Sequence, residues 1–380
     1  MISKIKTPHL LGIFLALLFL FVISNVTALK QSSHLEAKLP SENKELVEIA
    51  KNIKDECVKD AKSFGNKETC YSKKFNLLAE KSGPELSFQV MGELQKIDPD
   101  AVGCHLIAHG IGLGSYKWNP NEWRKLIREM NPSCNYGAIH GVLENYINSL
   151  PQKSFSKEII PTICGENPRA DCNHIIGHMI LVETDGDVKE GLSLCEVLTD
   201  PIQLNHCYSG VFMEEETALN LITHGIVDKS WLNWPARLPE LDKLCRTFSG
   251  EKFKACWTEL VHVIVVAYGN DPKSVFNYCS RAPSNDAAQS CKYHGIGIMA
   301  AGTNFDLPKI KSWCDFKQLD NPNFKSNCYV QLVASTISTI PKEQDKIKQF
   351  CQSLESAYQP SCFDQISGYN NYTKNTFSND

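Results

Sequence analysis

Apolar residues recur along the chain with helical spacing rather than with the alternation of strands. The segments 256–268 and 291–301 are rich in apolar residues over roughly three turns and predict buried helices. The segment 341–351 instead places Ile347 and Phe350 at helical spacing among lysines and acidic residues, which predicts a shorter amphipathic helix. No alternating β-branched run is bounded by Asn-Gly or Asp-Gly turns. The pattern therefore predicts an all-α chain.

Two classes of cysteine follow the same alternation. Cysteines of the first class open the apolar segments and recur 30 to 49 residues apart, mostly near 35, which is the range of two-helix repeats. Cysteines of the second class close the amphipathic segments, one polar loop before the next opening cysteine. The opening class comprises Cys70, Cys104, Cys134, Cys172, Cys207, Cys256, Cys291, Cys328 and Cys362, and the closing class Cys57, Cys164, Cys195, Cys245, Cys279, Cys314 and Cys351. We expect a helix-turn-helix repeat solenoid of about nine units.

The longest spacing in the first class suggests how the repeats are divided. It lies between Cys207 and Cys256 and contains residues 223–236, which we interpret as an insertion. Trp231 and Trp234 are expected to be exposed aromatic residues of this loop. The predicted order is N-terminal repeats over 45–222, the insertion over 223–236, C-terminal repeats over 237–370 and a frayed tail over 371–380.

The sixteen cysteines also indicate the redox environment. C-x-x-C does not occur, so zinc ribbons, thioredoxin-like redox sites and c-type haem attachment lack their signature. An even, high cysteine count predicts disulfides and an oxidising compartment. Sequence alone leaves other connectivities open, but the regular order favours joining each closing cysteine to the next opening one, and Cys104 to Cys134. The favoured pairs are Cys57–Cys70, Cys104–Cys134, Cys164–Cys172, Cys195–Cys207, Cys245–Cys256, Cys279–Cys291, Cys314–Cys328 and Cys351–Cys362.

The N-terminus independently indicates export. A short basic region precedes an apolar run at residues 10–26, and Val26-Thr27-Ala28 offers small residues for a signal-peptidase site. The run is longer than the about 7–15 residues of most signal peptides and slightly shorter than the about 20 of a membrane span. Residues 1–28 are therefore expected to be either a signal peptide or an N-terminal membrane anchor, followed by a linker over 29–44. The expected location is periplasmic, extracellular or at the cell surface.

Charge and hydrophobicity exclude some classes of protein. Hydrophobic residues make up 42% of the chain and charged residues 22%, which is close to the average of globular proteins. The formal net charge is −4. A mildly acidic chain gives no electrostatic reason to expect a nucleic-acid partner.

The repeat period and the cysteine placement, over roughly residues 45–370, resemble tetratricopeptide-type repeats and in particular the secreted, cysteine-rich Sel1-like proteins. In that family the second helix of one repeat is tied to the first helix of the next. The resemblance concerns architecture, because the Sel1-like glycine and alanine consensus is not reproduced. It implies a superhelical scaffold with a concave face, and no functional residue is carried over.

The opening segments of the first half carry a register of histidines. His105 and His109, and likewise His174 and His178, are four residues apart and share a helix face. His109, His140 and His178 follow their cysteine by five or six residues, so neighbouring repeats would bring them together. Neutral imidazole is the commonest metal ligand. The candidate ligands for zinc or another transition metal are His105, His109, His140, His174, His178, Glu144 and Glu183.

The same register is also compatible with simple packing. Gly110 and Gly141 directly follow His109 and His140 and suit close helix–helix approach, which needs no ligand. The motif H-E-x-x-H is absent, so a metalloprotease helix is disfavoured. The acidic run Glu214-Glu215-Glu216 is expected to be a solvated helix face.

Two functions from different classes follow from these patterns. The favoured one is an exported or membrane-anchored scaffold that presents a concave face to a protein, peptide or glycan at the cell surface. The alternative is a metal-binding protein or a metal-dependent enzyme, hydrolytic or redox, built on the histidines. No catalytic residue is assigned by the sequence.

Overall fold

The computed structural model describes residues 43–60, 64–98, 101, 104–130, 134, 136–151, 156–165, 170–218, 220–221, 226–303, 305–315, 322–340 and 344–377. The predicted export segment and most of the predicted linker lie outside these residues. Within them, no helix combines the length and the apolar character needed to cross a membrane. Residues Ile49–Asp380 form one compact unit, which contains every site discussed below.

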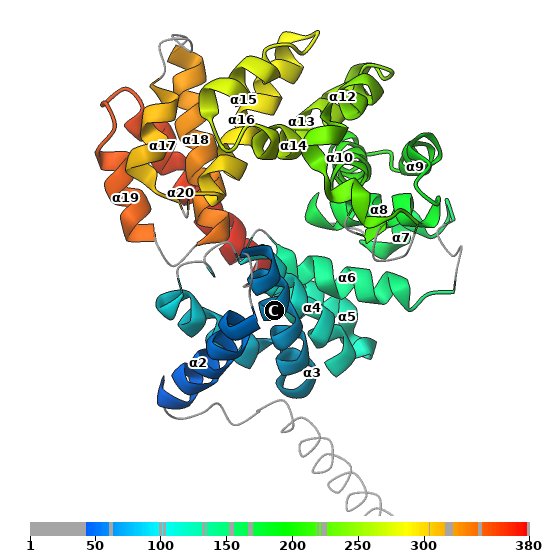
Figure 1. Ribbon diagram of the computed structural model, residues 1–380, viewed down its shortest axis with the longest axis vertical. Coiled ribbons are helices and arrows are strands. Elements are labelled where there is room, and N and C mark those ends of the chain that lie inside the picture. The colour runs from blue at the N-terminus through cyan, green and yellow to red at the C-terminus, as the bar shows by residue number, and fades with distance from the viewer. Residues whose placement is uncertain are drawn as a thin grey trace, which may run out of the picture. The chain divides into compact units, whose positions relative to one another are not determined.

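Every regular element in the described residues is helical, which confirms the predicted all-α class (Figure 1). One set, here called the central helices, comprises α3 (Phe64–Ile97), α4 (His105–Trp118), α6 (Gly137–Asn148), α8 (Ala170–Glu183), α10 (Pro201–Thr217), α13 (Gly250–Glu259), α16 (Asn285–Ala301), α18 (Pro322–Thr339) and α20 (Gln359–Phe377). The others are α2 (Asn43–Asp60), α5 (Trp123–Glu129), α7 (Ile160–Ile163), α9 (Val188–Cys195), α12 (Trp234–Cys245), α14 (Val261–Ala267), α15 (Pro272–Cys279), α17 (Leu307–Cys314) and α19 (Gln344–Gln352), with 3₁₀ turns η2 (Pro120–Glu122) and η3 (Lys229–Leu232).

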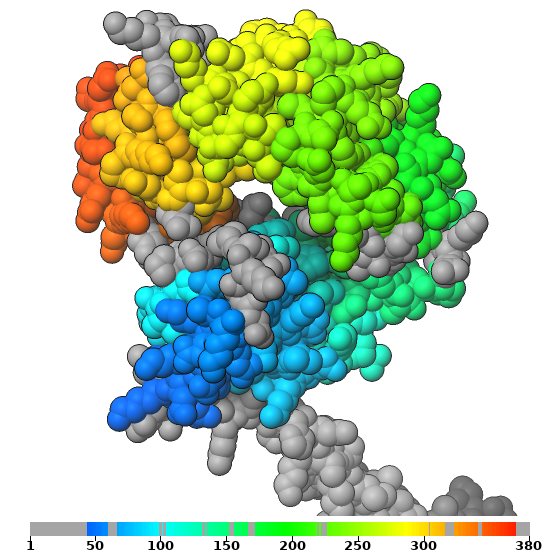
Figure 2. All heavy atoms as spheres, in the orientation of Figure 1, coloured from blue at the N-terminus to red at the C-terminus, as the bar shows by residue number. Residues whose placement is uncertain are grey.

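The central helices pack against one another in chain order. Each contacts the next, from α3 and α4 through α10 and α13 to α18 and α20. The shorter helices lie beside them, so that α15 contacts α16, α17 contacts α18 and α19 contacts α20. In the space-filling view the colours accordingly change step by step from green through yellow to orange (Figure 2). Most of the core is thus built between neighbours in the sequence.

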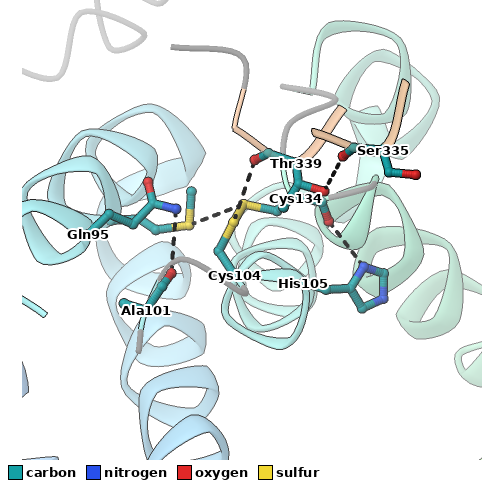
Figure 3. The surroundings of a disulfide bond; sticks show 8 residues. Gln95, Ala101, Cys104, His105, Cys134, Ser335 and Thr339 are labelled. Carbon is teal, nitrogen blue, oxygen red and sulfur yellow. Dashed lines mark hydrogen bonds between the residues drawn. A yellow bond between two sulfur atoms is a disulfide. The ribbon is translucent and has the colours of Figure 1, made fainter. Parts of the chain in front are cut away.

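One set of contacts joins residues far apart in the chain. The N–H of Cys134 donates a hydrogen bond to the carbonyl oxygen of Thr339, at the end of α18, over 3.3 Å. The disulfide between Cys104 and Cys134 lies at this point, with Thr339 beside it (Figure 3). Helix α20 also packs against α5. The last helices therefore contact the beginning of the same unit.

Eight disulfides join the same cysteines as the eight predicted pairs. Most join the end of a short helix to the following central helix, as Cys279 at the end of α15 is joined to Cys291 in α16. Their Cα atoms lie 5.2 to 5.9 Å apart. No described cysteine is free. Such a framework is typical of proteins in oxidising compartments.

The prediction that the cysteines open the helices is confirmed for Cys104, which directly precedes α4, but it is wrong for several later helices. Helices α10 and α16 begin six residues before Cys207 and Cys291. Asp200 and Ser284 are the reason, because their side chains accept hydrogen bonds from backbone N–H groups of the first turn. The loops are therefore shorter than predicted, and each of these two disulfides enters its helix at the second turn.

Two further predicted boundaries differ from the structure. The predicted insertion 223–236 ends inside a helix, because α12 begins at Trp234. Trp231 and Trp234 are half-buried rather than exposed, and the guanidinium of Arg237 lies 3.9 Å from the Trp231 ring centroid. The predicted helix 256–268 is divided between α13 and α14, with an interruption at Leu260 that hydrophobicity does not reveal.

Candidate functional site

Glycines let the histidine-bearing helices touch backbone to backbone. A Cβ atom on Gly112 of α4 would lie 1.9 Å from the carbonyl oxygen of Ala138 in α6. A Cβ atom on Gly210 of α10 would lie 1.8 Å from the carbonyl oxygen of His174 in α8. Such distances exclude any side chain, so only glycine permits these contacts. The close approach places histidines of neighbouring helices within reach of one another.

The structure brings all five predicted histidines together. We call His105, His109, His140, His174 and His178 the histidine cluster. The ring of His140 in α6 lies between the two pairs, with its centroid 5.1 Å from that of His105 and 5.9 Å from that of His174. The His174 and His178 centroids are 4.8 Å apart. The helical register inferred from the sequence is therefore also a spatial cluster.

Carboxylates and a backbone carbonyl orient three of these rings. Nδ1 of His178 bonds to Oε2 of Glu214 over 3.0 Å, and Nε2 of His109 lies 2.9 Å from Oε2 of Glu144. Nδ1 of His105 lies 3.1 Å from the carbonyl oxygen of Cys134, as Figure 3 shows. The remaining nitrogen of His178, Nε2, lies 3.1 Å from Nε2 of His174.

Burial keeps the middle of the cluster neutral. Desolvation lowers the pKa of His140 and of His174 well below the ordinary value of 6.5, and neighbouring imidazoles lower both further. Near neutral pH these rings therefore carry no charge. Each keeps one nitrogen lone pair, which is the form of histidine that binds metal ions.

A second group lies on α13, α14 and α16. The ring centroids of His262 and His294 are 5.1 Å apart. Oε2 of Glu259 lies 3.6 Å from Nδ1 of His262 and 3.7 Å from Nε2 of His294. Burial lowers the pKa of both imidazoles to about 4, and burial raises the pKa of Glu259. His262 follows Cys256 by six residues, as the histidines of the cluster follow their cysteines, whereas His294 follows Cys291 by only three. Glu259 carries no signal in the sequence beyond its position three residues before His262.

The carboxylates of the site differ in part from those predicted. Glu144 lies beside His109 as expected. Glu183 is the last residue of α8, and the carboxylate bonded to His178 comes from Glu214 of α10 instead. The sequence held one usable signal, because Glu214 is one helical turn beyond Gly210 and so shares the face that contacts α8.

The prediction that Glu214-Glu215-Glu216 forms a solvated face is wrong. These residues are only 1%, 7% and 1% exposed. Helix α10 packs between α8 and α13, so this end of it is covered. Glu214 accepts hydrogen bonds from the backbone N–H groups of Asn220 and Leu221, and Glu215 accepts one from Arg237. These hydrogen bonds compensate for the cost of burying the two carboxylates. The acidic run itself does not reveal them, because the donors lie outside it.

A third group of possible donors does not suit a metal. One atom each of Glu216, Cys245 and Cys256 lies within 4.8 Å of the others. The two sulfur atoms form a disulfide, and it is the thiolate that binds metal ions. Burial raises the pKa of Glu216 well above its ordinary value, which favours the neutral form of this carboxyl. The group is therefore a buried acid beside a disulfide.

Comparison with protein-family models, with curated proteins and with solved structures found no match. The resemblance to Sel1-like proteins therefore rests on repeat period and cysteine placement. Any functional conclusion has to come from the geometry of the two histidine-containing groups.

Proposed function

We propose that this chain binds a divalent transition-metal ion, zinc or another ion of the first row, at the histidine cluster. The observation that carries the proposal is the pair of Nε2 atoms of His174 and His178, which face each other over 3.1 Å. Two nitrogens bound to one tetrahedral zinc ion at about 2.0–2.1 Å are about 3.3 Å apart. The pair is thus almost at the spacing that one ion requires.

The hydrogen bonds of His178 support a ligand role. Because the Glu214 carboxylate accepts a hydrogen bond from Nδ1, the ring proton lies on Nδ1 and the lone pair on Nε2. A carboxylate that holds the second nitrogen of a histidine is the usual arrangement around protein-bound zinc. In the metal-free chain Nε2 of His174 then donates its proton to this lone pair. To bind the ion through Nε2, His174 would carry its proton on Nδ1 instead, which is the other neutral tautomer of the ring.

His140 is the third ligand that we propose. Imidazoles on one zinc ion have ring centroids about 5 Å apart. The His140 centroid lies 5.9 Å from that of His174 and 6.2 Å from that of His178, so the His140 ring would have to move and turn towards the pair to bring a nitrogen to the ion. Because the ring is neutral and its surroundings are buried, protons and water would compete only weakly with an ion at this position.

A second candidate function is a binding scaffold, and the order of helix packing favours it. Central helices that contact their chain neighbours support a solenoid of about nine helix-turn-helix units. Solenoids commonly present a concave face to a protein, peptide or glycan. In this function the histidines would serve packing, and hydrogen bonds such as that between His178 and Glu214 would be their whole role.

Metal analysis of the purified full chain separates the two functions. The protein is prepared from an oxidising compartment without chelators, dialysed against zinc, and analysed for bound metal. We expect the His174→Gln/His178→Gln variant to lose one equivalent of metal relative to the wild type. Zinc should also stabilise the wild type against unfolding, by about 2.7 kcal/mol at a hundred times Kd.

The control is Glu190→Gln, which changes an exposed carboxylate on α9. It should keep the metal content of the wild type. Circular dichroism and a thiol assay verify that each variant is helical and fully oxidised. If the folded double variant binds as much zinc as the wild type, the histidine cluster is not a metal centre and the scaffold function becomes the better account.

A further inference from the structure

Donor atoms in the second half of the chain converge without satisfying one another. Glu259 is 4% exposed, and its Oε2 has no hydrogen-bond partner among the described residues. The same is true of Nε2 of His294, 3.7 Å away. Buried polar groups in folded proteins nearly always have partners. A carboxylate oxygen and an imidazole nitrogen that face each other beyond hydrogen-bond distance therefore point to a ligand between them.

We propose that Glu259, His262 and His294 form a second metal centre, distinct from the histidine cluster. One donor atom of each residue lies within 4.8 Å of the others. Two imidazoles and one carboxylate suit zinc, iron(II), cobalt(II) or manganese(II), whereas calcium and magnesium prefer oxygen ligands alone. The ligand class is therefore a first-row divalent transition-metal ion.

The distances fit one ion. Donors bound to a tetrahedral ion at about 2.0–2.2 Å are about 3.3–3.6 Å apart, and Oε2 of Glu259 lies 3.7 Å from Nε2 of His294. The centroids of His262 and His294 are 5.1 Å apart, against about 5 Å for two imidazoles on one ion. Small side-chain movements would bring Glu259 and His294 to bonding distance, and the donor atom of His262 lies within 4.8 Å of theirs.

Neighbouring groups already hold two of the ligands in place. The hydroxyl of Ser209 in α10 donates a hydrogen bond to Oε1 of Glu259, which leaves Oε2 directed at the imidazoles. Nδ1 of His262 lies 3.0 Å from the backbone carbonyl oxygen of Glu259. Metal-binding histidines commonly donate their second N–H to such a carbonyl, and metal-binding carboxylates are themselves hydrogen-bonded.

This centre shares no ligand with the one proposed at the histidine cluster. Its residues come from α13, α14 and α16, whereas those of the cluster come from α4, α6 and α8. Each centre can therefore fail without the other, and the wild type is expected to bind two ions.

Cobalt(II) titration of the full chain, followed by visible absorption, tests the second centre. Glu259→Gln and His294→Gln should each lose one cobalt equivalent and its absorption bands. His174→Gln/His178→Gln should lose the other equivalent and keep these bands. Ser209→Ala keeps all three ligands but removes the group that orients the carboxylate, so the Kd of this centre should rise about 10–100-fold.

The matched control is Glu240→Gln, an exposed carboxylate on α12, which should titrate like the wild type. The proposal is overturned if folded Glu259→Gln and His294→Gln bind as many cobalt ions as the wild type with the same spectrum. If those variants do not fold, the Ser209→Ala variant provides the test. An unchanged Kd for both cobalt equivalents in this variant would contradict the proposal of a second metal centre. Loss of metal in the His174→Gln/His178→Gln variant alone would leave only the proposed function standing.

Discussion

Several carboxylates of this protein are buried in its interior, including those of Glu144, Glu214 and Glu259. Glu214 illustrates how one of them is retained there. Its carboxylate orients His178 and at the same time accepts the backbone N–H groups of Asn220 and Leu221. Burying a charged group is costly unless such partners compensate. The carboxylate therefore has a structural role as well as a place in the proposed metal site.

Protonation of buried histidines should make their contribution to stability depend on pH. Burial lowers the pKa of His262 and His294 to about 4, whereas in the unfolded chain it is about 6.5. Between these values the unfolded chain binds protons that the folded chain does not, so the two residues contribute less stability as the pH falls. Glu216 and Glu259, whose pKa burial raises, act in the opposite direction.

A comparison of variants isolates the histidine contribution. We expect the difference in the free energy of unfolding between the wild type and His262→Gln/His294→Gln to shrink by on the order of 3 kcal/mol from pH 7 to pH 4.5. Denaturant titration in the presence of a chelator measures it without bound metal. A difference that is the same at both pH values would mean that the two rings are not held neutral by burial.

At the residue scale, the sequence predicted the residues that recur at regular positions, but it did not predict partner residues that occur only once. Three of the five histidines follow a cysteine by five or six residues and the other two lie four residues before one of these, so a simple register located them. Glu259 repeats nowhere and reaches the two imidazoles only because α13 ends and α14 begins just after it. Arg237, which compensates the buried Glu215, lies 22 residues away along the chain.

At the scale of elements, the glycine contacts determine where the histidines lie. Gly210→Ala would put a methyl group 1.8 Å from the carbonyl oxygen of His174 and push α8 away from α10. We expect a loss of about 1–3 kcal/mol of stability and a weaker metal site at the histidine cluster. Thermal unfolding and zinc binding measure the two effects.

Gly368 provides the matched control for that change. It is an exposed residue of α20, and nothing lies within 4 Å of a Cβ atom built on it. Gly368→Ala should stabilise the helix by up to about 1 kcal/mol, because alanine is the better helix former. Equal effects of the two substitutions would show that the contact between α8 and α10 does not depend on glycine.

The helix starts are a second property of the elements, and the sequence did contain their signal. Asp200 precedes Pro201, which is the arrangement of an N-cap followed by a proline in the first turn. The more regular cysteine spacing drew the predicted boundary to Cys207 instead. Cysteine order determined the pairing correctly, but it carries no information about where a helix begins.

Removing this cap should weaken the helix by a predictable amount. Asp200→Ala loses the acceptor of two hydrogen bonds, from the N–H groups of Ile202 and Gln203. We expect about 1 kcal/mol lower stability in denaturant unfolding. Asp200→Asn, which keeps the side-chain oxygen, should retain most of the stability. A loss as large as that of the alanine variant would instead indicate that the negative charge, and not the cap, is what matters.

For the whole molecule, the disulfides divide into local and long-range ones. Seven close segments of 8 to 14 residues and so tie neighbouring helices together. Cys104–Cys134 spans 30 residues and lies where Thr339 of α18 meets the beginning of the same unit. Elsewhere the central helices contact their neighbours in the sequence. The hydrogen bond between Cys134 and Thr339 instead joins two segments that contacts between sequence neighbours would not bring together.

Because of that position, we expect removal of the Cys104–Cys134 disulfide to lower stability more than removal of a local disulfide. By loop entropy alone, Cys104→Ala/Cys134→Ala should cost about 3–4 kcal/mol, against about 2–3 kcal/mol for Cys164→Ala/Cys172→Ala, which opens only 8 residues. The first variant also disturbs the hydrogen bond to Thr339. Amide hydrogen exchange should show faster exchange near the end of α18 in the first variant and only local changes in the second. Unchanged exchange in α18 would mean that its contact with the first helices contributes nothing to the stability of the unit.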